Sequence, residues 1–320
     1  MQLWRAFRAF FLLYGLGLGM ALAASSQQAL VDAPQLAALV DVPQVRIIDI
    51  RAPEDYAKAH VPGAISAPYG RWRGPANNPG ELLSTAALQQ LLQELGVQAN
   101  EHIVVYSTGD SQTDFGAAAR VYWTLKYAGL QHLSVLDGGF QQWLATQQST
   151  STDSPQIVGS DYVVQANTDL VVFKEELIEQ VNAPTATSQL LDARPRAFYQ
   201  GQVKAPTAST PGTIATARNA EHQQWFKTDS ATLKSTEQIQ QLVREQGLDQ
   251  ATATISFCNT GHWAATNWFV LSEIAGLPQV RLYPASLAEW TQNEQALPME
   301  HTPSRWQQIQ TQFKQLLKKD

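Results

Sequence analysis

The chain has 320 residues, more than a single domain usually contains, so we expect two domains. Hydrophobic residues make up 44% of the chain, which is enough for sizeable cores, and charged residues only 16%, which excludes a disordered, highly charged chain. The net charge of −6 excludes the basic surface that nucleic-acid-binding proteins need, so we expect no nucleic-acid partner.

The N-terminus has the features of a secretory signal peptide. Arg5 and Arg8 precede a mostly apolar run over residues 9–22, and small residues follow directly. The run is short for a transmembrane helix and rich in glycine, so a signal peptide over residues 1–24 fits better than a membrane anchor. We therefore expect a periplasmic or secreted protein with no stable membrane insertion once the signal is removed.

From residue 44 onward, strand-like and helix-like stretches alternate in the first half of the chain. The predicted strands are residues 44–50, 102–106 and 133–136, and the predicted helices are residues 85–95 and 116–127. Gly96 ends the first of these helices, as a C-terminal glycine does. Strands that alternate with helices predict an α/β fold in which a parallel sheet carries helices on both faces.

The second half of the chain repeats this order. The matching segments are residues 47–51 (IIDIR) with 190–194 (LLDAR), and residues 61–65 (VPGAI) with 210–214 (TPGTI). Trp290 lies 147 residues after Trp143, and an Ala-Gly-Leu triplet recurs at the same spacing. Equal spacing at separate landmarks indicates a duplicated domain.

The duplication sets the expected domain boundaries. We expect domains at residues 25–150 and 156–300, joined by a Gln-, Ser- and Thr-rich segment and followed by a helical tail at residues 301–320. Aligning the two halves places Ser107 opposite Cys258, so the first domain lacks the thiol of the second. The first-domain loop at residues 107–114 is then expected to be about four residues longer than its counterpart.

Cys258 lies where a predicted strand becomes a predicted helix. Residues 254–257 are strand-like, and apolar residues recur at helical spacing after residue 262. Backbone N–H groups of a tight loop and a helix start have no intrahelical acceptor and favour an anion in front of them. Such a loop therefore favours a thiolate, a charged persulfide or a bound oxyanion at Cys258.

Cys258 is also the only cysteine of the chain. Cysteines of exported proteins usually pair as disulfides, and this one has no partner in its own chain. A free thiol retained in an oxidising compartment favours a chemical role. The histidines, including His60, show no ligand spacing, so we expect neither a metal site nor a cofactor.

Three motifs together resemble one enzyme family. Residues 258–263 (CNTGHW) are similar to the six-residue active-site loop of rhodanese-type sulfurtransferases, in which a cysteine opens the loop. Residues 60–64 (HVPGA) and 136–143 (LDGGFQQW) resemble two further signatures of that family. The chain thus resembles a tandem rhodanese of the thiosulfate and 3-mercaptopyruvate sulfurtransferase family, with a non-catalytic first domain and a catalytic second one, over roughly residues 30–300.

The resemblance implies sulfur transfer through a persulfide on Cys258. A small sulfane-sulfur donor such as thiosulfate would load the cysteine, and a thiol or cyanide would accept the sulfur in a second half-reaction. Gly261 would let the loop turn inward without a Cβ clash. The loop N–H groups that would stabilise the persulfide and the departing oxyanion belong to Asn259, Thr260, Gly261, His262 and Trp263.

Five further roles stay open at the level of sequence. Arg194 is expected either to brace the loop through a salt bridge or to touch substrate. His262 is expected to add positive charge or a hydrogen bond, or to face outward. Arg71 and Arg73 are candidates for closing the site from the first domain, and Arg218 for either the site or the surface.

The loop departs from the family pattern in ways that leave the donor open. Thiosulfate-specific members commonly carry basic residues directly after the cysteine, where this chain has Asn259 and Thr260. Members that use 3-mercaptopyruvate commonly carry small residues there. The alternatives are a 3-mercaptopyruvate sulfurtransferase and a sulfur-relay module loaded by a partner protein. A cysteine phosphatase needs an arginine that closes the loop, and Trp263 stands there instead.

Overall fold

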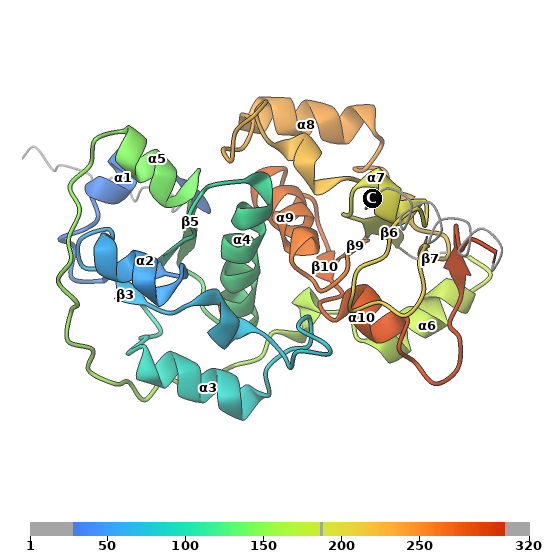
Figure 1. The fold of residues 1–320 in the computed structure, drawn as a ribbon, viewed down its shortest axis with the longest axis horizontal. Helices are drawn as coiled ribbons and strands as arrows, with labels where there is room; N and C mark the ends of the chain where they lie inside the picture. Colours follow the sequence, from blue (N-terminus) through green and yellow to red (C-terminus); the bar gives the residue numbers. More distant parts are fainter. Residues whose placement is uncertain (1–27, 186–187, 305–320) are drawn as a thin grey trace, which may run out of the picture.

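A computed structural model describes residues 28–185 and 188–304 (Figure 1). The signal peptide predicted at residues 1–24 and most of the predicted C-terminal helical tail lie outside these residues. Within the described part of the chain, no helix is both long and apolar enough to cross a membrane.

The N-terminal domain is built on a sheet of five parallel strands. Their spatial order is β1 (Leu30–Val31), β5 (Leu133–Leu136), β4 (His102–Tyr106), β2 (Val45–Asp49) and β3 (Ile65–Ser66). The helices packed on one face are α1 (Ala33–Ala37), α2 (Pro53–Lys58) and α5 (Gly139–Ala145), and those on the other are α3 (Thr85–Glu94) and α4 (Gln112–Tyr127). Every residue of β4 is buried, as expected of a central strand covered on both faces.

The C-terminal domain repeats this arrangement around four parallel strands. Their order is β10 (Val280–Leu282), β9 (Thr254–Phe257), β6 (Gln189–Asp192) and β8 (Arg218–Asn219). The helices are α6 (Lys174–Asn182), α7 (Arg196–Tyr199), α8 (Thr236–Glu245), α9 (Trp263–Phe269) and α10 (Ser286–Trp290). The strand order matches that of β5, β4, β2 and β3, so the predicted α/β fold with two tandem domains is confirmed.

One detail of the predicted repeat is wrong. The sequence alignment pairs Ile65 of β3 with Ile214, but the strand beside β6 is β8, four residues further on. Ile214 belongs instead to β7 (Thr213–Ile214), which pairs antiparallel with β11 (Met299–Glu300). The strand that follows the second Pro-Gly turn therefore lies outside the parallel sheet and pairs with the last strand of the domain.

The predicted length difference between the two strand-to-helix loops is also wrong. Five residues separate strand from helix in both domains, because α4 begins at Gln112 rather than Gly116. The Ser111 side chain accepts a hydrogen bond from the Asp114 N–H and caps α4 at this earlier point. The extra residues lie in the helix: α4 has 16 residues, whereas α9 has 7 and the π-helix after it (Val270–Ile274) has 5.

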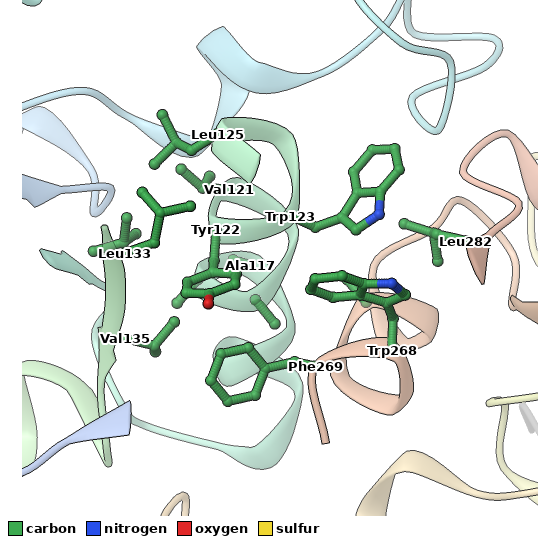
Figure 2. Packing of buried hydrophobic residues seen from close by; sticks show 14 of the residues in the cluster. Ala117, Val121, Tyr122, Trp123, Leu125, Leu133, Val135, Trp268, Phe269 and Leu282 are labelled. Atoms are coloured by element: carbon green, nitrogen blue, oxygen red, sulfur yellow. The ribbon is translucent and has the colours of Figure 1, made fainter. Parts of the chain in front are cut away.

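Helices α4 and α9 join the two domains through a shared apolar core. Figure 2 shows α4 side chains between the strand residues Leu133 and Val135 on one side and Trp268 and Phe269 of α9 on the other. The Tyr122 and Phe269 rings meet edge to face with centroids 5.0 Å apart. Burying each such ring stabilises by about 1.5–3 kcal/mol, so the junction is packed like a core and not like a hinge.

Candidate active site

Cys258 directly follows β9, a strand in the interior of its sheet. It therefore lies at the carboxyl edge of a parallel sheet, where α/β proteins place their ligands. Its side chain is 1% exposed, and its backbone N–H donates to the Ser286 hydroxyl at 3.1 Å. The carbonyl groups of Cys258 and Asn259 accept hydrogen bonds from the first turn of α10 at 3.2 and 2.9 Å. The loop is thus held from the side of α10.

The N–H groups of the loop are free to bind an anion. Within the described residues, none of the backbone N–H groups of residues 259–262 donates to a protein acceptor. Gly261 has a φ of +68°, and a Cβ there would lie 2.3 Å from the Pro284 carbonyl oxygen and from Arg120 Nη1. Only glycine fits this turn, and the unpaired N–H donors belong to the residues that directly follow the cysteine.

Arg194 braces the loop, which is one of the two roles predicted for it. Its guanidinium is buried and pairs with Asp192, with 2.6 Å between Nη2 and Oδ2. Nη2 also donates to the Gly212 carbonyl at 2.7 Å, and Nη1 to Asn259 Oδ1 at 3.3 Å. Through this last bond Arg194, which lies just after β6, holds Asn259, the residue that follows the cysteine.

His262 contributes hydrogen bonds and no charge. Its Nε2 lies 2.6 Å from the Thr113 carbonyl, which only accepts, so Nε2 carries the proton. Its Nδ1 then accepts from the Tyr69 hydroxyl at 3.0 Å. Desolvation by burial lowers the pKa of His262 to about 4, so the ring is neutral at pH 7. Of the roles predicted for His262, the structure shows the hydrogen bond.

Trp263 is the first residue of α9 and packs at the domain junction. Its ring stacks on that of His222, with centroids 4.9 Å apart and planes within 7°. Its Nε1 donates to Thr113 Oγ1 of the N-terminal domain at 3.2 Å. The last residue of the CNTGHW motif thus fixes the helix against the other domain.

Three side chains of the N-terminal domain lie at the loop. Arg73 donates through Nη2 to the Thr260 carbonyl at 2.7 Å, and buried Arg120 of α4 directs Nη1 at the Gly261 carbonyl, 3.4 Å away. Tyr69, Arg73 and Arg120 interact electrostatically, and Tyr69 and Arg120 also interact with Cys258. The candidate site is therefore built from both domains.

The other two arginine candidates are engaged elsewhere. Arg71 pairs with Glu94 at the surface, 2.6 Å away, and exposed Arg218 donates to the Gln246 carbonyl at 2.7 Å. Tyr69 and Arg120 were not predicted from the sequence. The available signal for Arg120 was a single cation in the middle of an otherwise apolar helical stretch.

The sequence model of the Rhodanese-like domain family matches this chain twice, at residues 32–146 and 173–293. The chain belongs to the rhodanese-like family. The predicted resemblance to tandem rhodaneses is thereby confirmed, and with it the assignment to the rhodanese-type sulfurtransferases.

Rhodanese relatives cover most of the chain at low identity. A protein of Haloferax volcanii is 27% identical over 261 residues, which are 78% of this chain and 87% of its own. One of Synechococcus elongatus is 27% identical over 272 residues, 82% of either chain. Both are named "putative thiosulfate sulfurtransferase".

Two solved structures share the fold of this chain. The 3-mercaptopyruvate sulfotransferase SseA of Escherichia coli superposes with a TM-score of 0.69 at 24% identity, over 81% of this chain and 98% of its own. The anaerobic ergothioneine biosynthesis enzyme of Chlorobium limicola gives a TM-score of 0.72 at 21% identity, over 85% of this chain and 70% of its own. At these identities the likeness concerns the fold alone.

The N-terminal rhodanese domain has a loop of the same length in which one backbone N–H group is bound by a side chain of the domain itself. Ser107 takes the place of the cysteine, and the Gly109 N–H donates to the carboxylate of Asp114. Burial raises the pKa of Asp114. An internal carboxylate thus binds an N–H group that in the C-terminal domain has no protein acceptor. The neighbouring pocket of about 300 Å³ is lined by Ser107, Asp114 and His262 among others.

A metal site is absent from the part of the chain that the structure describes. No group of three or more His, Cys, Asp or Glu side chains lies close enough there to hold an ion. His60, for example, uses both ring nitrogens on the backbone carbonyls of Tyr56 and Asp153, at 2.7 and 3.0 Å.

Proposed function

We propose that this rhodanese moves sulfane sulfur from thiosulfate, or a related donor, to a thiophilic acceptor through a persulfide on Cys258. In the first half-reaction the thiolate attacks the outer sulfur of thiosulfate, the S–S bond of the donor breaks, and sulfite leaves with the electron pair. In the second, cyanide or a thiolate attacks the outer persulfide sulfur, and the Cys258 thiolate departs. No external oxidant or reductant takes part.

The observation that carries the proposal is the placement of Cys258 among unpaired donors. Cys258 opens a loop whose next four backbone N–H groups have no protein acceptor among the described residues, and two guanidinium groups of the other domain contact this loop. Such donors stabilise a thiolate, a persulfide and a departing sulfite, because all three are anions. The residues in direct support are Asn259, Thr260, Gly261 and His262 through their backbone N–H groups, with Arg194 holding Asn259.

Turnover with a small donor separates this proposal from a sulfur relay. We expect purified protein to form thiocyanate from thiosulfate and cyanide, Cys258→Ser to abolish this, and Ser107→Ala to leave it within about twofold. A Cys258 that accepts sulfur only from a partner protein would contradict the enzyme proposal and support the relay. Side-by-side kinetics with 3-mercaptopyruvate decides between the two donor classes.

We also propose export to the periplasm or the medium, on the basis of the N-terminal sequence. The retained single cysteine fits an exported protein whose thiol is used chemically. Cell fractionation with N-terminal sequencing of the mature chain tests this. A protein found in the cytoplasm with residues 1–24 still attached would contradict the proposed export.

A further inference from the structure

One buried and one half-buried arginine contact the catalytic loop without a carboxylate partner among the described residues. The ion pairs of the described residues join arginines 46, 51, 71, 194 and 281 and lysines 58, 126 and 174 to acidic groups, and they include neither Arg73 nor Arg120. Arg120 is fully buried and Arg73 is half-buried. Burying a charge without a counterion is costly, so this pair calls for a functional explanation.

Both guanidinium groups keep buried donors that no protein atom uses. Arg120 gives Nη2 to the Gly80 carbonyl at 2.9 Å, but its Nε has no partner among the described residues. Arg73 gives Nη2 to Thr260, and its Nη1 has no partner there either. An unpaired buried N–H group costs about 1–3 kcal/mol, and more when the group is charged. A bound anion is the kind of partner that such donors accept.

The two arginines are close enough to act together and stay charged. Desolvation, and after it the charge of Arg73, lower the pKa of Arg120 to about 9, which leaves it protonated at pH 7. The groups that face it are Arg73, Tyr69 and Cys258, and none of them is a carboxylate. Because His262 is neutral, the site has an excess of positive charge that comes from the N-terminal domain.

We propose that Arg73 and Arg120 form an anion subsite that binds the sulfonate end of a thiosulfate-type donor, and then the departing sulfite, beside Cys258. This inference rests on the proposed function and specifies its substrate class. It also accounts for the departure of the loop from the family pattern. Asn259 and Thr260 carry no charge, and the non-catalytic domain supplies the cations that the loop lacks.

A charged and a neutral alkylating reagent test the subsite without sulfur transfer. Iodoacetate carries the negative charge that the subsite should attract, and iodoacetamide does not, while both react with the same thiolate of Cys258. The rate with iodoacetate divided by the rate with iodoacetamide therefore measures how strongly the site attracts an anion. The fraction of Cys258 that is ionised affects both rates equally and drops out of this ratio. We expect Arg73→Met and Arg120→Met each to lower this ratio by about tenfold. Arg71→Met is the matched control, because Arg71 lies two residues away and pairs with Glu94 at the surface.

Protection experiments identify the anion. In the reduced wild-type protein, methanesulfonate, a sulfonate that does not react with iodoacetamide, should slow alkylation at a lower concentration than pyruvate, and Arg73→Met should weaken this protection at least tenfold. Stronger protection by pyruvate would overturn the sulfonate assignment. An unchanged ratio in the two variants would overturn the subsite itself. If Arg120→Met does not fold, Arg73→Met and the wild-type protection experiment still decide.

A failure of the proposed subsite can be distinguished from a failure of the proposed sulfur-transfer reaction. If the alkylation ratio falls in both variants but wild-type protein makes no thiocyanate from thiosulfate, the subsite stands and the proposed reaction fails. If thiosulfate is turned over and the ratio is the same in Arg71→Met, Arg73→Met and wild type, the reaction stands and the subsite fails.

Discussion

Replacing Arg194 by Met should destabilise the protein and slow loading of the catalytic cysteine by separate routes. The substitution removes the ion-pair partner of Asp192, a fully buried carboxylate. Among the described residues, Asp192 then keeps the Thr213 hydroxyl at 2.7 Å and the residue 194 N–H at 3.0 Å. Removing one member of a buried ion pair costs about 3–5 kcal/mol. The bond to Asn259 is lost as well, so the loop residue next to the sulfur is no longer held.

The duplicated domain provides a matched control for this substitution. Arg51 pairs with buried Asp49 at 2.6 Å and donates to the Ala59 carbonyl at 2.7 Å. Arg194 makes the equivalent ion pair with Asp192 and the equivalent hydrogen bond to the Gly212 carbonyl. Arg51 belongs to the domain without the cysteine. Arg51→Met should therefore lose a similar free energy of unfolding, about 3–5 kcal/mol, without losing sulfur transfer at temperatures where it stays folded.

Two measurements on each variant test this reasoning. Urea unfolding followed by circular dichroism gives the free energy of unfolding, and stopped-flow reaction with thiosulfate gives the rate of persulfide formation. We expect both variants to be destabilised and only Arg194→Met to load at least tenfold more slowly. Equal loading rates in the two variants would show that the contact with Asn259 does not position the loop. A loss below about 1 kcal/mol would refute the energetic argument for the ion pair.

Two further predictions concern the loop and its surroundings. Gly261→Ala should lower the free energy of unfolding by about 1–3 kcal/mol and slow sulfur loading, because the new Cβ meets the Pro284 carbonyl. Gly276 has a similar φ of +73° but open space around it, so Gly276→Ala should lose only the free energy of the strained backbone in urea titrations. Equal effects of the two alanines would refute the steric argument. Burial lowers the pKa of His222 from 6.5 to about 4, so its contribution is complete above pH 6.5 and is lost as the pH falls toward 4. Between pH 7 and 4.5 the free energy of unfolding of wild type should fall by roughly 2–3 kcal/mol more than that of His222→Phe, because the lowered pKa of His262 acts alike in both proteins. Equal losses in the two proteins would contradict this.

The sequence predicted those features that depend on local patterns. The strand-loop-helix around Cys258 follows from an apolar run, a glycine and helical spacing, and the structure has β9, the loop and α9 in that order. The start of α4 was missed because Ser111 caps a helix whose first turn is polar, and polar residues were interpreted as loop. The signal that would have placed the start of α4 correctly is Ser111 itself, a capping residue that precedes a polar first turn and then an apolar helical stretch.

Contacts between the domains could not be predicted in the same way. Arg120 lies between three alanines and Val121 of α4, and the sequence does not say which face of that helix meets the other domain. Only the packing of α4 against α9 brings its guanidinium to Gly261. The distinction between Arg71 and Arg73 has the same origin, since a short 3₁₀ turn (Tyr69–Trp72) directs one to the surface and the other to the loop.

The mass of the intact protein after treatment with thiosulfate tests the central claim most directly. Folded wild-type protein should gain about 32 Da, the mass of one sulfur atom, on the peptide that contains Cys258, and cyanide should remove it. Neither Cys258→Ser nor urea-unfolded wild type should gain this mass, because one lacks the thiol and the other lacks the folded loop. An unchanged mass in the folded wild-type protein, or an equal gain in the Cys258→Ser variant, would contradict the assignment of Cys258 as the sulfur carrier.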